Sequence, residues 1–184
     1  MSEEKTNGPW KIKSSSVRYK NPWMEVVEDD VIRPDGKHGI YGKINMMPGV
    51  AVLPIDNKGF VYLIREFKYA IGEYSIEVIC GGVESEENIL TAAKRELREE
   101  TGITANEFIN LGELHSISNL VKSSTNIFIA KDLTLGEPDR EGTEVMETLK
   151  MPLEDAVKMV MDGKIQHAPS CVLILKADRI LKKG

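Results

Sequence analysis

The alternation of apolar and polar residues predicts a protein built mainly on β-strands. The two kinds of residue alternate over Met24 to Ile32, and the turn composition of Arg33-Pro-Asp-Gly36 follows, so antiparallel strands are expected in the N-terminal third. Further strand-like runs predict a mixed sheet: Val50 to Ile55, Phe60 to Arg65, Tyr74 to Ile79, Ile109 to Ile117, Asn126 to Ala130 and Val145 to Met151.

Helical spacing of apolar residues replaces this alternation in three places. The first predicted helix spans Glu86 to Thr101 and ends at Gly102, a residue type typical of helix C-termini. The second begins at Pro152 and stops before Gly163, and the third spans Val172 to Leu181. Strands and helices together indicate an α/β protein.

Length and composition fit one folded domain over residues 1–184, because 41% of the residues are hydrophobic and 29% are charged. The polar start and short apolar runs predict neither a secretory signal nor a membrane span. Cys80 and Cys171 lie outside any Cys/His motif, so reduced thiols and a cytoplasmic setting are expected. A net charge of -5 disfavours nucleic acid but allows a small phosphorylated ligand.

The segment from residue 81 to 103 carries the strongest chemical signal. Glu96, Glu99 and Glu100 are spaced i, i+3 and i+4, which places three carboxylates on one face of a helix. Like charges this close repel, so a divalent cation should compensate them. The oxygen-only donor set favours Mg²⁺, with Mn²⁺ as an alternative.

The same segment matches every fixed position of the Nudix box, and the chain is identified as a member of the Nudix hydrolase family. Chance would produce the whole pattern in roughly one chain in ten million of this length. The matching residues are Gly81, Glu87, Arg95, Glu96, Leu97, Glu99, Glu100, Gly102 and Ile103. A solvated acidic helix explains the glutamates alone and leaves the spacing of the glycines without a reason.

The resemblance implies an α/β/α Nudix sandwich that hydrolyses a phosphoanhydride bond. It adds the backbone carbonyl of Cys80 to Glu96, Glu99 and Glu100 as metal ligands, and Arg95 is expected to hold the acidic face in shape by pairing with Glu99. A second acidic group should orient the attacking water. By resemblance, Glu144 is the candidate in the catalytic set with Glu141 in reserve, although both also fit an ordinary acidic loop.

Outside the box the chain resembles the ADP-sugar pyrophosphatase branch, which acts on ADP-ribose and related nucleoside diphosphate sugars. Trp23 and Tyr41 match two aromatics that sandwich the base in a pocket between two subunits, which implies a homodimer with residues 1–47 at the interface. Arg65 and Lys68 match a segment that contacts the substrate phosphates. Judged by burial habits alone, the two aromatics could equally be core, dimer-contact or strand residues without a role in base binding. The two cations could equally be ordinary surface charges.

One departure leaves the substrate open. Residues 103–137 lack the proline-containing segment that is common in ADP-ribose hydrolases and instead hold a polar loop from His115 to Thr125. GDP-mannose or another nucleotide sugar therefore competes with ADP-ribose as the substrate. Other Nudix substrates, such as an RNA cap or a damaged nucleoside triphosphate, are a further alternative. The alternative outside the enzymes is a non-catalytic regulator that binds nucleotides. His38, His115 and His167 show no metal-ligand spacing and are expected in turns or on the surface.

Overall fold

A computed structural model describes residues 5–138 and 146–182 of the chain, and the chain divides into two compact units. The first unit consists of Met1–Met47 with Ile117–Ser123, and the second of Pro48–Ser116 with Ser124–Gly184.

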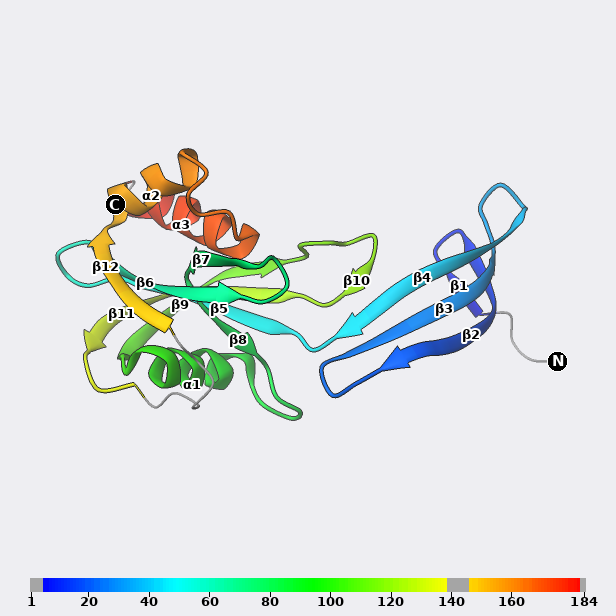
Figure 1. Cartoon of the computed structure of the whole chain (residues 1–184), viewed down its shortest axis with the longest axis horizontal. Helices are drawn as coiled ribbons and strands as arrows, with labels where there is room; N and C mark the ends of the chain where they lie inside the picture. The colour runs from blue at the N-terminus through cyan, green and yellow to red at the C-terminus, as the bar shows by residue number, and fades with distance from the viewer. Residues whose placement is uncertain (1–4, 139–145, 183–184) are drawn as a thin grey trace. The chain divides into compact units, whose positions relative to one another are not determined.

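The first unit is a five-stranded sheet in the order β1-β2-β3-β4-β10 (Figure 1). Its strands are β1 (Lys5–Asn7), β2 (Trp10–Lys20), β3 (Met24–Ile32), β4 (His38–Met46) and β10 (Val121–Lys122). The pairs among β1 to β4 are antiparallel, which confirms the antiparallel strands predicted for this third of the chain. The parallel β10 comes from the polar loop after His115 and was not predicted, because its pairing with β4 is non-local.

The second unit holds two sheets (Figure 1). The four-stranded sheet has the order β8-β5-β11-β9, and its β5–β11 pair is parallel while the others are antiparallel. Its strands are β8 (Ile79–Gly82), β5 (Gly49–Pro54), β11 (Thr125–Thr134) and β9 (Thr104–Leu114). The three-stranded antiparallel sheet joins β12 (Met146–Pro152), β6 (Phe60–Lys68) and β7 (Glu73–Glu77).

Helices cover both faces of the four-stranded sheet. On one face, α1 (Ile89–Thr101) contributes Ala93 and Leu97 to a buried cluster with Val50 and Ile79. On the other, α3 (Ala168–Leu181) contributes Leu173 and other residues to a second cluster with Leu53 and Ile127, together with α2 (Leu153–Met161). The predicted α/β/α sandwich is confirmed. Because the four-stranded sheet lies between the two clusters, its strands can direct side chains towards α1 on one face and towards α2 and α3 on the other.

All three helices begin at other residues than the sequence pattern predicted, and α2 does so by one residue, at Leu153 after Pro152 as its N-cap. The first starts at Ile89 rather than Glu86, because the side-chain oxygen of Asn88 accepts a hydrogen bond from the Leu90 amide and caps the helix. The third starts at Ala168 rather than Val172, with Pro169 in its first turn, where a missing amide proton costs nothing.

The predicted end of α1 at Gly102 is confirmed, since this residue has a left-handed backbone (φ 72°) and its amide bonds to the Arg98 carbonyl. A Cβ at Gly102 would also lie 2.3 Å from the carbonyl oxygen of Gly136, so the glycine allows the following loop to pass against the helix end.

Two further findings concern the membrane and cysteine expectations. Among the described helices, none combines the length and the apolar character needed to cross a bilayer. Cys80 and Cys171 are both free thiols, as predicted.

Candidate active site

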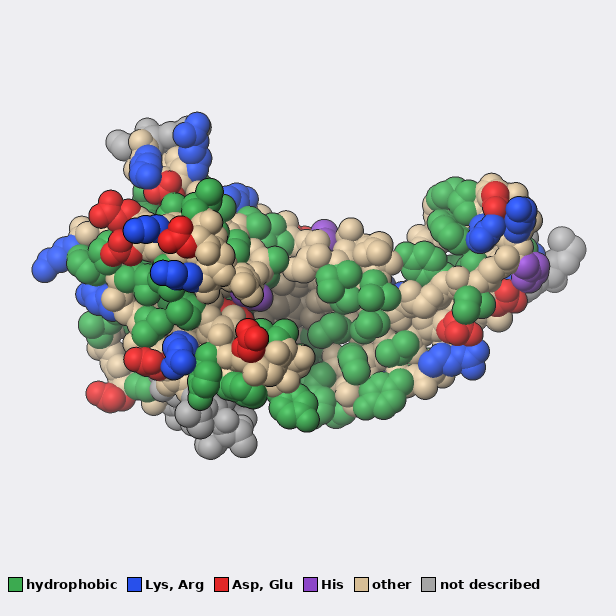
Figure 2. All heavy atoms as spheres, turned by 45° about the horizontal axis from the view of Figure 1, so that its top comes forward, with side chains coloured by type: hydrophobic (Ala, Val, Ile, Leu, Met, Phe, Trp, Pro, Cys, Tyr) green, Lys and Arg blue, Asp and Glu red, His purple; other side chains and the backbone are tan. Residues whose placement is uncertain are grey.

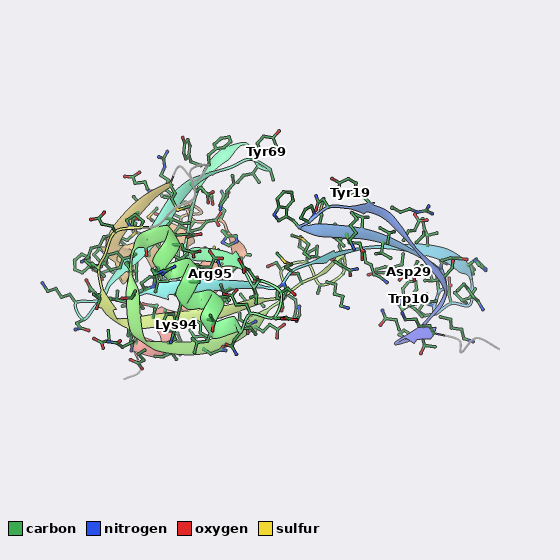
Figure 3. The ribbon with its side chains drawn as sticks, turned by 90° about the horizontal axis from the view of Figure 1, so that it is seen from below. Trp10, Tyr19, Asp29, Tyr69, Lys94 and Arg95 are labelled. Atoms are coloured by element: carbon green, nitrogen blue, oxygen red, sulfur yellow. The ribbon has the colours of Figure 1, made fainter. Side chains whose placement is uncertain are left out.

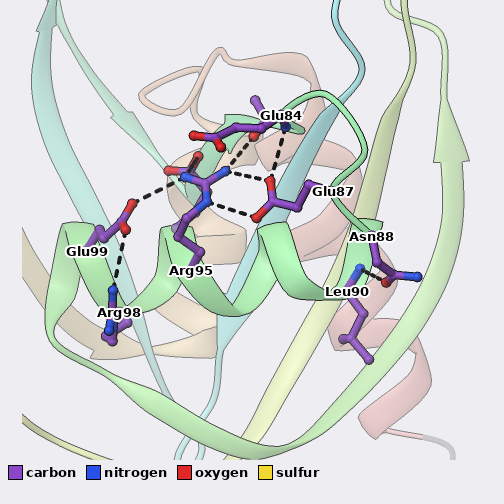
Figure 4. Close-up of polar contacts among 9 residues, drawn as sticks. Glu84, Glu87, Asn88, Leu90, Arg95, Arg98 and Glu99 are labelled. Atoms are coloured by element: carbon purple, nitrogen blue, oxygen red, sulfur yellow. Dashed lines mark hydrogen bonds and ion pairs between the residues drawn. The ribbon is translucent and has the colours of Figure 1, made fainter.

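Glu96, Glu99 and Glu100 of the box lie on α1, whereas Glu87 precedes the helix. Arg95, also on α1 (Figure 3), connects Glu87, Glu96 and Glu99 (Figure 4). Its guanidinium donates to both carboxylate oxygens of Glu87, with distances of 3.0 and 2.9 Å. It also donates to Glu96 at 2.7 Å and to Glu99 at 3.2 Å, and to the Gly82 carbonyl at 2.9 Å. The predicted pairing of Arg95 with Glu99 is confirmed, and three further partners join it.

These contacts fix the charge state of the pair that anchors the network. The hydrogen bond from Arg95 holds the pKa of the Glu87 carboxyl below its ordinary value, and the Glu87 carboxylate raises the pKa of Arg95. Glu87 lies one residue before the Asn88 cap and binds Arg95 two turns further along the helix. Arg95 therefore ties the loop before α1 to two of the expected metal ligands.

Gly81 brings Glu96 close to the strand β8. A Cβ built on Gly81 would lie 1.8 Å from the Cδ atom of Glu96 and about as close to both carboxylate oxygens, at 2.0 and 2.3 Å. Only glycine at this position lets the carboxylate rest against the backbone. The Glu96 side chain thus occupies the space beside the Cys80–Gly81 peptide, where the Cys80 carbonyl was expected to serve as a ligand.

Glu100 supplies a buried carboxylate to the same region, with a relative exposure of 7%. Burial raises the pKa of the Cys80 thiol well above its ordinary value, and the carboxylates of Glu100 and Glu77 act in the same direction to a smaller extent. A buried carboxylate is costly unless it is hydrogen-bonded, paired or bound to metal.

The donor set fits a hard divalent cation. Carboxylate oxygens from Glu96, Glu99 and Glu100 would hold it together with the carbonyl oxygen of Cys80, and Mg²⁺ and Mn²⁺ prefer such all-oxygen sites. The missing Cβ at Gly81 supports this fit, because it lets the Glu96 carboxylate reach the backbone of β8.

The two expected phosphate-binding cations lie on β6 in the second unit. Lys68 is 2.5 Å from Glu66 and 3.7 Å from Glu77. Burial opposes its charge, but these two carboxylates prevail and raise the pKa of Lys68. Arg65 stacks its guanidinium 4.1 Å from the centre of the Tyr74 ring. Both cations are held in place by neighbours rather than loose on the surface.

The two expected base-stacking aromatics belong to the first unit. Trp23 precedes β3 and is 69% exposed. Tyr41 on β4 packs edge-on against Trp10 with ring centroids 5.4 Å apart, and its hydroxyl donates to the Asn119 carbonyl at 2.5 Å. Glu144 and Glu141, expected to orient the water, lie outside the described residues.

His167 is in a different environment from the one that the sequence suggested. It precedes α3 and is half-buried, with Nδ1 2.8 Å from the Ser170 hydroxyl and 3.4 Å from a Glu77 oxygen. His38 and His115 lie on the surface as predicted, each next to an exposed acid. No spacing in the sequence indicates the contact between His167 and Glu77, because it joins segments far apart in the chain.

Comparisons with known proteins agree with this geometry. The NUDIX domain family matches residues 46–170, and the nucleoside diphosphate sugar hydrolase N-terminal domain matches residues 10–44. The first match falls mainly in the second structural unit and the second match lies within the first unit.

Individual relatives match over most of the chain. An ADP-ribose pyrophosphatase of Bacillus subtilis (strain 168) is 28% identical over 174 residues, which is 94% of this chain and 91% of the relative. A GDP-mannose pyrophosphatase of Cronobacter sakazakii is 28% identical over 159 residues, covering 79% of this chain and 82% of the relative. A crystal structure of an ADP compounds hydrolase superposes with a TM-score of 0.81 at 23% identity and covers 94% of both chains, which supports the fold. Because the NUDIX domain match spans more than half of the chain and includes the whole acidic helix, this chain belongs to the Nudix hydrolase family.

Proposed function

We propose that this chain hydrolyses the pyrophosphate bond of a nucleoside diphosphate sugar, ADP-ribose or a close relative, to a nucleoside monophosphate and a sugar phosphate. The observation that carries the proposal is the α1 carboxylate face seated against Gly81. It is supported by the match of the first unit to the nucleoside diphosphate sugar hydrolase N-terminal domain and by the ADP-ribose pyrophosphatase relative.

In this proposal the residues of the second unit hold the reacting end of the substrate. Bound at Glu96, Glu99, Glu100 and the Cys80 carbonyl, Mg²⁺ would neutralise the pyrophosphate and lower the pKa of a bound water. Arg95 acts as a positioning residue, because it holds Glu96 and Glu99 at fixed distances from Glu87. Lys68 and Arg65 would bind the phosphates, and Glu66 keeps Lys68 protonated and oriented.

The first unit would bind the base, and its geometry favours a dimer. Met24 pairs with Met46 and Asp29 with Tyr41, so Trp23 and Tyr41 of one chain lie about six residues apart along the strands, roughly 20 Å. Two aromatics this far apart cannot stack on one base. A sandwiched base therefore requires one aromatic from each of two copies.

Exposed apolar side chains on this unit are consistent with such an interface. Hydrophobic side chains lie on the visible surface of this unit (Figure 2). Tyr19 and Ile40 are 53% and 70% exposed and share one face of the sheet, because they lie opposite Val26 and Asp30 on β3. An apolar sheet surface of this kind is typical of a face that is covered by a partner. We propose that the strands of residues 1–47 form the homodimer contact.

GDP-mannose remains the second candidate substrate, because one relative is a GDP-mannose pyrophosphatase. The test is a panel of ADP-ribose, GDP-mannose, UDP-glucose and dinucleoside polyphosphates with Mg²⁺, scored by the products that appear. A single nucleotide sugar cleaved to its two monophosphates supports the proposal. Turnover of dinucleoside polyphosphates alone would contradict it.

The role of the carboxylate face is tested in the same assay. Glu99→Gln and Glu100→Gln should each abolish turnover with Mg²⁺ present and leave the circular dichroism spectrum unchanged, because the amide cannot replace a charged metal ligand. Glu107→Gln, on an exposed position of β9, is the matched control and should keep the wild-type rate. Binding of nucleotide sugars without turnover in the wild type would favour the regulator alternative.

A further inference from the structure

A second group of metal-ligating side chains lies in the same unit as the carboxylate face but has a different chemistry. One ligand atom each from Glu77, Cys80 and His167 fall within 4.8 Å of one another. They are an oxygen, a sulfur and a nitrogen, whereas the α1 set offers oxygen alone. Sulfur and nitrogen ligands select zinc-class cations over magnesium.

The cluster lies on the opposite face of the sheet from α1. Cys80 packs with Val78 against the apolar cluster that contains Leu173 of α3, whereas Ile79 joins the cluster of α1. The Cys80 side chain therefore points to the α3 layer, while its neighbour Gly81 faces Glu96 of α1. One short strand thus contributes to two different polar groups, one on each face.

Contacts at the start of α3 hold the histidine at this position. The Ser170 hydroxyl accepts a hydrogen bond from the Val78 amide at 2.9 Å and lies 2.8 Å from Nδ1 of His167. Ser170 is fully buried and Glu77 is only 6% exposed, so the strand and the helix start are locked together. His167 contacts both the Ser170 hydroxyl and Glu77 through Nδ1, so a metal bound at Nδ1 would replace the Ser170 contact and leave the bond from the Val78 amide to Ser170 in place.

The distances are close to those of a bound zinc-class ion. Zinc bonds of about 2.0–2.3 Å in tetrahedral geometry place neighbouring ligand atoms roughly 3.3–3.6 Å apart. Glu77 and His167 are already 3.4 Å apart. The remaining separations are at most 4.8 Å and would close by up to about 1.5 Å, which side-chain rotation can supply.

Lys68 already competes for one of the three ligands, because its ammonium group lies 3.7 Å from a Glu77 oxygen. Because Glu66 already holds the ammonium group at 2.5 Å, Lys68 can give up Glu77 and keep an ion pair.

We propose that Glu77, Cys80 and His167 form a binding site for a zinc-class divalent cation, separate from the magnesium face on α1. Three protein ligands leave one tetrahedral position for water or another small ligand. Metal binding replaces the thiol proton, which passes to solvent as the thiolate–metal bond forms.

Cobalt is the probe, because a thiolate bound to Co²⁺ gives a charge-transfer absorption in the near ultraviolet that carboxylate ligands do not give. The full-length protein is titrated with Co²⁺ in excess Mg²⁺, which saturates the oxygen-only face. The wild type should develop the absorption with one equivalent of Co²⁺ per chain, and Zn²⁺ should remove it. Absence of the absorption in the folded wild-type protein overturns the proposal, whatever the variants do.

Variants then identify the ligands. Cys80→Ser should abolish the absorption, and Cys171→Ser is the matched control, since its thiol bonds to the Ile165 carbonyl outside the cluster. His167→Ala should keep the absorption but weaken Co²⁺ affinity by at least about tenfold. An absorption that persists in Cys80→Ser, disappears in Cys171→Ser or is insensitive to His167→Ala would refute the assignment.

Discussion

Replacing Gly81 by alanine tests how the strand and the helix build the carboxylate face. The new Cβ would lie 1.8 Å from the Cδ atom of Glu96, so the carboxylate must withdraw by about 1.6 Å to reach ordinary contact at 3.4 Å. Cδ is near the end of a flexible side chain, and Gly81 is not among the residues with positive φ. The fold should therefore survive while the ligand is displaced.

The expected loss follows from that displacement. A misplacement of about 1 Å costs roughly a hundredfold in rate, which corresponds to about 2.7 kcal/mol in the activation barrier. Gly81→Ala should therefore lower kcat for nucleotide-sugar hydrolysis by about a hundredfold or more. Its unfolding midpoint in urea should stay close to that of the wild type.

A double-mutant cycle tests whether the effect runs through Glu96. In the Glu96→Ala background the clash is gone, so adding Gly81→Ala should cause little further loss of kcat. Wild-type activity in Gly81→Ala would refute the reasoning. So would losses that multiply in the double variant, because they would mean that the two residues act independently.

Two further predictions concern stability and are checked by urea denaturation. Lys43→Met should destabilise the first unit by about 1–3 kcal/mol, because it leaves the buried carboxylate of Asp29 without its ammonium partner, whereas Lys37→Met at an exposed turn should have little effect. Burial opposes the charge of Asp29, yet the hydrogen bonds from Lys43 and Ser15 lower its pKa. The stabilisation of the fold by this ion pair should therefore be full above the unfolded-state pKa of Asp29 and lost as the pH falls through the lower folded-state pKa. Equal pH dependence of the stability of the wild type and Lys43→Met would contradict this. Ser170→Ala should cost about 1–3 kcal/mol, because the buried Val78 amide loses its acceptor, and an unchanged midpoint would show that another acceptor replaces the hydroxyl.

Interactions between residues close in sequence were predictable from the sequence alone. Arg95 and Glu99 are four residues apart, and helical geometry brings such residues together whatever surrounds them. The end of α1 at Gly102 was equally predictable, because the left-handed conformation needed there favours glycine. The family-specific spacing of the box extended these local rules to the chemistry of the site.

Only the tertiary structure decided which distant segments meet. The approach of Glu96 to Gly81 depends on how α1 packs on β8, and the meeting of His167 with Glu77 and Cys80 depends on how α3 packs on the other face of the same sheet. The pairing of β10 with β4 likewise joins segments that no local pattern connects. The physical reason is that periodicity fixes which face of an element a side chain occupies, whereas the partner of that face is chosen by the packing of the whole unit.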